Sequence, residues 1–255
     1  GRIAAEGLIG VAIKGNVGAL VEVNAETDFV SRNDVFQAYV RTVTGLALEK
    51  GDDPSSLLAG ECPESGRSVE EELTHLIATI GENMSLRRAA RLQVEDGVMA
   101  SYIHNSVVPS MGRIGVLVGL SSPGDKEKLS DLGKQVAMHV AAANPQSVSQ
   151  DDLDPELIER ERAILVEQVR ASGKPEDIIG KMVEGRLRKF FEEVVLLDQT
   201  FVIDGESKVS QAIAEAAKDM GAEVTITGFM RFVLGEGVER KEEDFAAEVA
   251  AVAGT

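Results

Sequence analysis

An internal repeat is the feature that most constrains the fold of this 255-residue chain. Three short segments recur in the same order later in the sequence, at separations of 97, 99 and 140 residues. The increase predicts two copies of one unit, the second with an insertion of about 41 residues. The matching segments are 15–23 with 112–120, Ile80-Gly81 with Ile179-Gly180, and 91–97 with 231–237.

Each copy is predicted to contain two strands, two helices and a third strand. In the first copy, β-rich runs at 8–13 and 19–24 flank Gly15, which supplies the positive φ of a tight turn. Residue types that cap helices then mark both ends of two helices. The first has Asn33 before it and Gly51 after it, the second has Ser68 with Glu71 at capping-box spacing and Gly81 after it, and an alternating strand follows at 86–94.

The insertion in the second copy is predicted to be a helical hairpin at about 181–221, with a turn near Asp204-Gly205. A short amphipathic helix is predicted within 238–255. Because strands and helices do not alternate in β-α-β order, the predicted fold class is α+β, with two pseudo-repeated subdomains of antiparallel sheets and flanking helices. The expected divisions are 1–96, 97–237 with the hairpin, and the C-terminal helical module.

Composition narrows the class of ligand. The chain has 26 basic and 43 acidic side chains and a net charge of −17, which repels phosphate backbones and argues against direct binding of nucleic acid. Cys62 is the only cysteine and the three histidines are scattered, so neither an internal disulfide nor a zinc-ligand spacing is present. Apolar runs are far shorter than the roughly 20 residues of a membrane-spanning helix. A soluble protein without metal or cofactor is expected.

No recognised catalytic spacing occurs in the sequence. A phosphate-binding loop is missing, and Gly235-Glu236-Gly237 lacks the third glycine of a dinucleotide fingerprint. Serine, histidine and aspartate do not fall in a nucleophile-elbow arrangement. The basic cluster of Arg87, Arg88 and Arg91 lies beside acidic residues and is interpreted as a solvated strand face. The chain is therefore not expected to be an enzyme.

The loop at 24–33 stands out because the repeat provides an internal control for it. At the separation of 97, Asp28 falls on Asp125 and Phe29 on Lys126, and the second copy makes the same connection without an aromatic residue. Turning the chain therefore does not require Phe29. Spacing alone favours a ring that packs under its own loop. The functional alternative exposes the ring as an anchor for a partner, with the carboxylate of Asp28 beside it.

At this loop the sequence resembles elongation factor Ts, the family of guanine-nucleotide exchange factors that act on elongation factor Tu. Thr27-Asp28-Phe29-Val30 is the hallmark of that family, and the resemblance covers nearly the whole chain. Each segment alone is short, whereas the ordered set is specific. The further matching segments are 24–26, 80–83, 114–118, 138–142, 172–175, 181–186, 231–232, 235–237 and 244–250.

The resemblance implies two core subdomains, a protruding antiparallel coiled coil and a C-terminal helical module. It also implies that Asp28 and Phe29 enter the GTPase domain of elongation factor Tu and disturb its magnesium and phosphate-loop contacts, so that GDP leaves and GTP can reload. Thr27, Val30 and His139 are implied to bind the same partner. By position alone, His139 is explained as a residue that suits the end of a helix.

One departure and two alternatives accompany the resemblance. Nothing before Gly7 resembles the family's small N-terminal helical module, and the start at Gly1 is interpreted as truncation. The alternatives are a protein-binding scaffold or subunit without exchange activity, and a small-molecule enzyme that uses Asp28 as a base. The expected location is the bacterial cytoplasm, with the mitochondrial matrix or the chloroplast stroma as further options.

Overall fold

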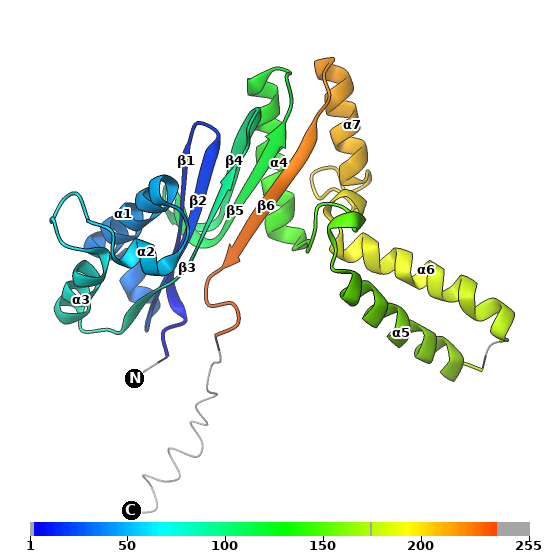
Figure 1. Ribbon diagram of the computed structural model, residues 1–255, viewed down its shortest axis with the longest axis horizontal. Coiled ribbons are helices and arrows are strands. Elements are labelled where there is room, and N and C mark those ends of the chain that lie inside the picture. The colour runs from blue at the N-terminus through cyan, green and yellow to red at the C-terminus, as the bar shows by residue number, and fades with distance from the viewer. Residues whose placement is uncertain (1–2, 174, 239–255) are drawn as a thin grey trace, which may run out of the picture.

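The computed structural model describes residues 3–173 and 175–238, so the helix predicted within 238–255 lies outside the described residues apart from Val238. Helices and antiparallel strands are mixed, which confirms the α+β class (Figure 1). The strands are β1 (Glu6–Lys14), β2 (Val17–Ala25), β3 (Met84–Gln93), β4 (Gly97–Val108), β5 (Met111–Ser121) and β6 (Thr225–Val233). The helices are α1 (Asp34–Lys50), α2 (Pro54–Leu58), α3 (Val69–Ile80), α4 (Lys126–Ala143), α5 (Pro155–Ala171), α6 (Glu176–Val194) and α7 (Val209–Met220), with short 3-10 helices η1 (Asp28–Arg32), η2 (Gln150–Asp152) and η3 (Leu196–Asp198).

The repeat corresponds to two units with the same order of elements. In the first unit β2 pairs antiparallel with β1 and β3, and in the second β5 pairs antiparallel with β4 and β6. α4 takes the place of α1, and α7 takes the place of α3 at a separation of 140 residues. Ile9 and Gly10 of β1 pair with Gly112 and Met111 of β5, so both units share one six-stranded sheet. The division of the chain at residue 96 stays a prediction.

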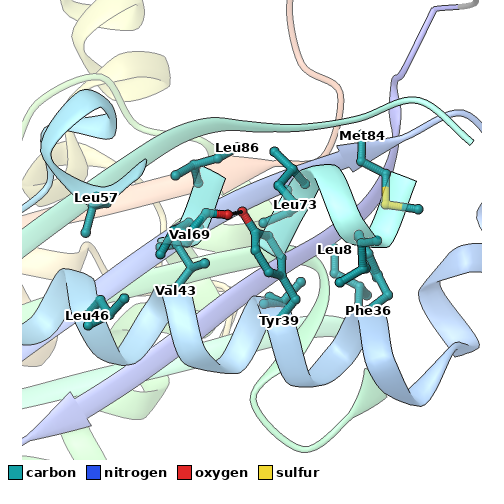
Figure 2. Packing of buried hydrophobic residues seen from close by; sticks show 14 of the residues in the cluster. Leu8, Phe36, Tyr39, Val43, Leu46, Leu57, Val69, Leu73, Met84 and Leu86 are labelled. Atoms are coloured by element: carbon teal, nitrogen blue, oxygen red, sulfur yellow. Dashed lines mark hydrogen bonds between the residues drawn. The ribbon is translucent and has the colours of Figure 1, made fainter. Parts of the chain in front are cut away.

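The curled sheet brings its two halves into contact. Ile9 and Leu20 of the first half share a hydrophobic cluster with Leu117 and Phe232 of the second. The opposite face of the first half packs against α1 and α3 (Figure 2), and α4 and α7 pack on the second half. β1 and β2 are therefore buried on both faces, which explains their nearly continuous apolar runs. A Cβ on Gly18 would lie only 2.7 Å from the Leu117 side chain, so glycine permits this approach.

The predicted helix signals are confirmed in the first unit. Asn33 caps α1 by accepting hydrogen bonds from two backbone N–H groups of its first turn, and Gly51 follows the last residue of that helix. Ser68 and Glu71 form the reciprocal capping box of α3. Gly81 ends α3 with a φ of 83°, a left-handed conformation that glycine adopts without a steric penalty.

The inserted hairpin consists of α5 and α6, so the prediction of a hairpin at 181–221 is wrong. α5 and α6 run side by side away from the sheet and bury an apolar seam between them (Figure 1). α7 instead packs on the second half of the sheet. The prediction fails because it pairs Ile80-Gly81 with Ile179-Gly180, which lies inside α6. The structural counterpart of Gly81 is Gly221, which also ends a helix with a positive φ.

Candidate functional site

The predicted loop at 24–33 forms a turn in which an exposed residue is followed by a buried one. The 3-10 helix η1 follows β2 and is followed by Asn33, the cap of α1. Phe29 is 78% exposed, the largest value of any large apolar side chain among the described residues, whereas the next residue, Val30, is 3% exposed. The packing of Phe29 under its own loop, which spacing alone favours, is therefore wrong. We call residues 26–33 the Phe29 turn.

Two buried polar side chains form hydrogen bonds with the backbone of the Phe29 turn. Ser31 Oγ donates to the backbone carbonyl of Asp28 at 2.6 Å. Gln37 Nε2, from the first turns of α1, donates to the backbone carbonyl of Ser31 at 2.8 Å. Both Ser31 and Gln37 are buried, and the hydrogen bond between them is shielded from water. The backbone beneath Phe29 is thus fixed although the ring itself is in solvent.

The turn between α3 and β3 holds the start of the Phe29 turn. Glu82 accepts a hydrogen bond from the backbone N–H of Thr27 at 3.0 Å and a second from Thr27 Oγ1 at 2.6 Å. In return, Glu26 Oε1 accepts from the backbone N–H of Asn83 at 2.9 Å. Sequence reasoning missed the role of Glu82, because no local pattern links two segments 55 residues apart. The only available signal was the segment 80–83 in the family resemblance.

The second unit makes the same connection with fewer residues. β5 ends at Ser121 and Asp125 caps α4, as Asn33 caps α1. The counterpart of Asp125 is therefore Asn33, and the pairing of Asp28 with Asp125 at a fixed separation is wrong. That pairing ignores the five residues of η1, which the first unit has in addition. The inference that the chain can turn here without Phe29 is unaffected.

His139 is not brought together with residues 27–30. It is fully buried in α4, its Nε2 lies 2.8 Å from Oε1 of Gln199, and its Nδ1 accepts from the backbone N–H of Val202 at 3.2 Å. These partners place the proton of the neutral ring on Nε2. Burial lowers the pKa of His139, although the hydrogen bond to Gln199 acts in the opposite direction. A side chain without exposed surface cannot contact a partner directly in this conformation, so the role of His139 stays a prediction.

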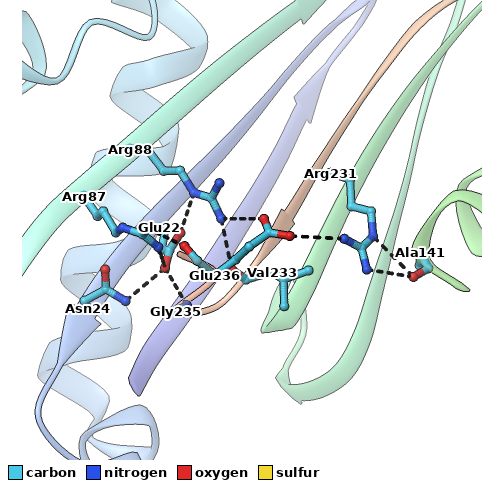
Figure 3. Close-up of polar contacts among 9 residues, drawn as sticks. All are labelled: Glu22, Asn24, Arg87, Arg88, Ala141, Arg231, Val233, Gly235 and Glu236. Carbon is cyan, nitrogen blue, oxygen red and sulfur yellow. Dashed lines mark hydrogen bonds and ion pairs between the residues drawn. The ribbon is translucent and has the colours of Figure 1, made fainter. Parts of the chain in front are cut away.

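The interpretation of Arg87 and Arg88 as a solvated strand face is wrong. Both bind the fully buried carboxylate of Glu22, at 3.0 Å from Arg87 Nη1 and 2.5 Å from Arg88 Nε (Figure 3). A register shift between β2 and β3 makes Arg87 an extra residue, so two consecutive arginines reach one carboxylate. Glu22 also accepts from the backbone N–H of Gly235 at 2.8 Å, which ties the first unit to the segment after β6.

The enzyme alternative requires a concave site around Asp28. Among the cavities lined by the described residues are four with volumes of 140, 370, 460 and 490 Å³, and Asp28 lines none of these four. Within residues 3–173 and 175–238, no three His, Cys, Asp or Glu side chains are placed to hold a metal ion. In the same part of the chain, every helix is too short or too polar to cross a bilayer. The Phe29 turn offers an apolar ring and a carboxylate on a fixed base, which suits insertion into another protein.

Comparison with known proteins identifies the family. The model of the family described as elongation factor TS matches residues 26–236. Elongation factor Ts of Rhodospirillum centenum is 59% identical over 254 residues, which are 100% of this chain and 83% of the relative. The relatives from Gluconobacter oxydans and Paramagnetospirillum magneticum are 58% and 56% identical over 255 residues, which are 100% of this chain and 82% of each relative. The chain therefore belongs to the elongation factor Ts family of translation elongation factors.

Proposed function

We propose that the chain binds elongation factor Tu and promotes release of GDP by inserting Asp28 and Phe29 into its GTPase domain. There the pair disturbs the contacts of magnesium and of the phosphate-binding loop, so that GTP can reload. The observation that carries the proposal is the exposed ring of Phe29 above a buried base at Val30. Aromatic side chains presented in this way are typical anchors of protein interfaces. Family membership supplies the class of partner.

The energetics follow from thermodynamic linkage. A factor that prefers the nucleotide-free partner must weaken nucleotide binding by the same ratio. A thousandfold weakening corresponds to about 4 kcal/mol of coupling free energy. Burial of the Phe29 ring contributes only about 1.5–3 kcal/mol. Further contacts must therefore provide the remainder, and loss of Phe29 alone should leave some affinity for the partner.

The other predicted site residues, Thr27, Val30 and His139, are less exposed than Phe29 and are proposed to stabilise the site. Val30 is buried at the base of the Phe29 turn, and the hydroxyl of the half-buried Thr27 binds Glu82. For His139 we propose an indirect contribution, because its ring holds the backbone of Val202, a residue whose own side chain is exposed. Since the three relatives named above come from bacteria, we propose the bacterial cytoplasm, where translation elongation takes place, as the location of this protein.

Release of a fluorescent GDP from elongation factor Tu tests the exchange function. Exchange activity predicts faster release at amounts of this chain well below those of the partner, because each molecule acts repeatedly. The scaffold alternative predicts that the two proteins elute together without faster release. Release that stays at its intrinsic rate, with or without co-elution, contradicts the proposal.

The Phe29→Ala variant tests the role of the ring. We expect GDP release to slow by roughly 10- to 100-fold, which corresponds to the loss of about 1.5–3 kcal/mol. The urea unfolding midpoint should not change, because the ring is already exposed. Ile164→Ala is the matched control, since Ile164 is an exposed apolar residue of α5, and the pair α5 and α6 projects from the side of the sheet away from α1 (Figure 1). Complete loss of complex formation by a folded Phe29→Ala protein would contradict the division between ring and further contacts.

A further inference from the structure

The side chain of Thr27 does not have the role that its position suggests. Thr27 is the residue before η1, where a threonine hydroxyl ordinarily accepts a hydrogen bond from the first turn. It makes no such capping bond. Its hydroxyl instead donates to Glu82 at 2.6 Å, and its backbone N–H donates to the other oxygen of the same carboxylate at 3.0 Å. One ionised group thus binds both donors of the residue two positions before Phe29.

A second hydrogen bond between the same two segments runs in the opposite direction. The backbone N–H of Asn83 donates to Glu26 at 2.9 Å. Each segment therefore supplies a carboxylate to the other, and the two residues before Asp28 are both held by residues 82–83. Two reciprocal carboxylate contacts restrict the Phe29 turn more than a single bond would, because rotation about one contact breaks the other.

The second unit provides an internal control for this arrangement. At the separation of 140 that relates α3 to α7, the counterpart of Glu82 is Ala222. The shorter connection there lies directly against it, since a Cβ on Gly124 would be 3.1 Å from the Cβ of Ala222. The same two connections are neighbours in both units. Close packing joins them where no aromatic residue is presented, and a carboxylate joins them where Phe29 is presented.

We infer that Glu82 is a positioning residue for nucleotide exchange: by binding Thr27 it fixes the Phe29 turn in the conformation that enters the partner. The inference rests on the proposed function, because it assigns Glu82 a task only if Phe29 is the inserted group. A turn that is ordered before binding loses less conformational freedom when the complex forms. Glu82 itself need not touch the partner to have this effect.

Exchange measurements test the inference with matched variants of Thr27 and Glu82. Thr27→Val removes the hydroxyl but keeps the branched shape, and Glu82→Ala removes the carboxylate. We expect each to slow GDP release by about tenfold at limiting concentrations, equivalent to about 1.4 kcal/mol. Thr27→Ser keeps the donor and should remain within about twofold of the parent, a rescue that a purely steric role of Thr27 does not predict. Unchanged exchange in both Thr27→Val and Glu82→Ala overturns the inference.

Fluorescence anisotropy of the isolated protein tests the positioning step without the partner. The chain contains no tryptophan, so a Phe29→Trp variant carries a single indole at the tip of the Phe29 turn. Adding Thr27→Val or Glu82→Ala should increase the amplitude of fast local motion of that indole.

If the motion of the indole does not change in either background, the inference is wrong even if exchange slows. If the motion increases but the parent chain does not accelerate GDP release, the proposed function fails while the contact between Glu82 and Thr27 stands. Thr27→Val decides the result if Glu82→Ala does not fold.

Discussion

The two strand-to-helix connections of this molecule differ in length, polarity and exposure, although they join corresponding elements. In the first unit, residues 26–33 include η1, present Phe29 to solvent and are held by Glu82. In the second unit, residues 122–125 pass from β5 to the cap of α4 and pack directly against Ala222. The fold needs only the short version. The extra residues of the first unit are therefore available for binding a partner, which is where we propose that they act.

The central strands of the two units show a second contrast. At the separation of 97, Glu22 of β2 corresponds to Gly119 of β5. Glu22 is fully buried and holds Arg87, Arg88 and the segment after β6 (Figure 3). A Cβ on Gly119 would lie 2.5 Å from Oγ1 of Thr227, so glycine allows close approach there. At this position the first unit therefore has a buried carboxylate that binds two arginines, whereas the second unit has a glycine that allows close packing.

The largest effect is expected for Glu22→Ala. Removing the carboxylate leaves two guanidinium groups, 26% and 30% exposed, without their buried partner. We expect the free energy of unfolding to fall by about 2–4 kcal/mol, somewhat less than for a fully buried pair. Urea denaturation measures this. The control is Glu49→Ala, which breaks an exposed ion pair with Lys14 and should cost less than about 0.5 kcal/mol. Equal losses in both variants would show that the Glu22 network does not stabilise the fold.

An intermediate effect is expected for Gly119→Ala in the second unit. The added methyl group would collide with Oγ1 of Thr227 and, at 2.6 Å, with a methyl carbon of Val94. Overpacking of this kind costs about 1–3 kcal/mol, which urea denaturation again measures. Gly45→Ala is the matched control, because Gly45 lies in α1 with open space around it and alanine should stabilise the helix by about 0.5–1 kcal/mol. A stabilising Gly119→Ala would refute the need for close approach at this strand.

A smaller effect is expected from acid, which should lower the stability of the two units in different pH ranges. Burial lowers the pKa of His139 below its ordinary value of 6.5, so the unfolded chain binds a proton there more readily. Stability of the second unit should therefore decrease as the pH falls below 6.5. Burial by itself raises the pKa of Glu22, but hydrogen bonds from Gly235, Asn24 and Arg88 hold it below its ordinary value of 4.5. The stability that Glu22 provides is present above pH 4.5 and is lost as the pH falls through its lower value in the folded chain.

Amide hydrogen exchange can resolve these two pH ranges along the chain. Protection in α4 should begin to weaken as the pH falls below 6.5, whereas protection in β2 should weaken only below 4.5. His139→Gln should abolish the change in α4. His75→Gln is the control, because His75 is exposed on α3 and its replacement should leave the profile as it is. Simultaneous loss of protection in both units at one pH would contradict independent titration of the two groups.

Local signals in the sequence predicted much of the scaffold. The β1–β2 hairpin, the cap at Asn33, the capping box at Ser68 and the end of α3 at Gly81 are confirmed, because each depends on backbone groups within a few residues. The helical hairpin was predicted with the wrong partner helix. Leu165 and Val169 are the only buried residues of α5, which has many charged side chains, so its apolar stripe is weak until α6 lies beside it.

For the candidate site, too, local features were predictable from the sequence and long-range contacts were not. The position of the loop and its special composition were evident from the repeat and from Thr27-Asp28-Phe29-Val30. Exposure of Phe29 was not, since a ring is buried or exposed according to what the rest of the chain places above it. The contacts of Glu82 with Thr27 and of Glu22 with Arg87 cross 55 and 65 residues. No periodicity within one element encodes such contacts.

The sequence by itself determined where the β1–β2 hairpin turns, where α1 and α3 begin and end, and that one unit occurs twice. These outcomes follow from hydrogen bonding, φ preferences and apolar periodicity over a few residues. Only the tertiary structure decided that both units share one curled sheet, that α5 pairs with α6, that His139 is buried and that Phe29 is exposed. The physical reason is that burial and long-range hydrogen bonds belong to pairs of segments, and their free energy is defined only once the chain has brought those segments together.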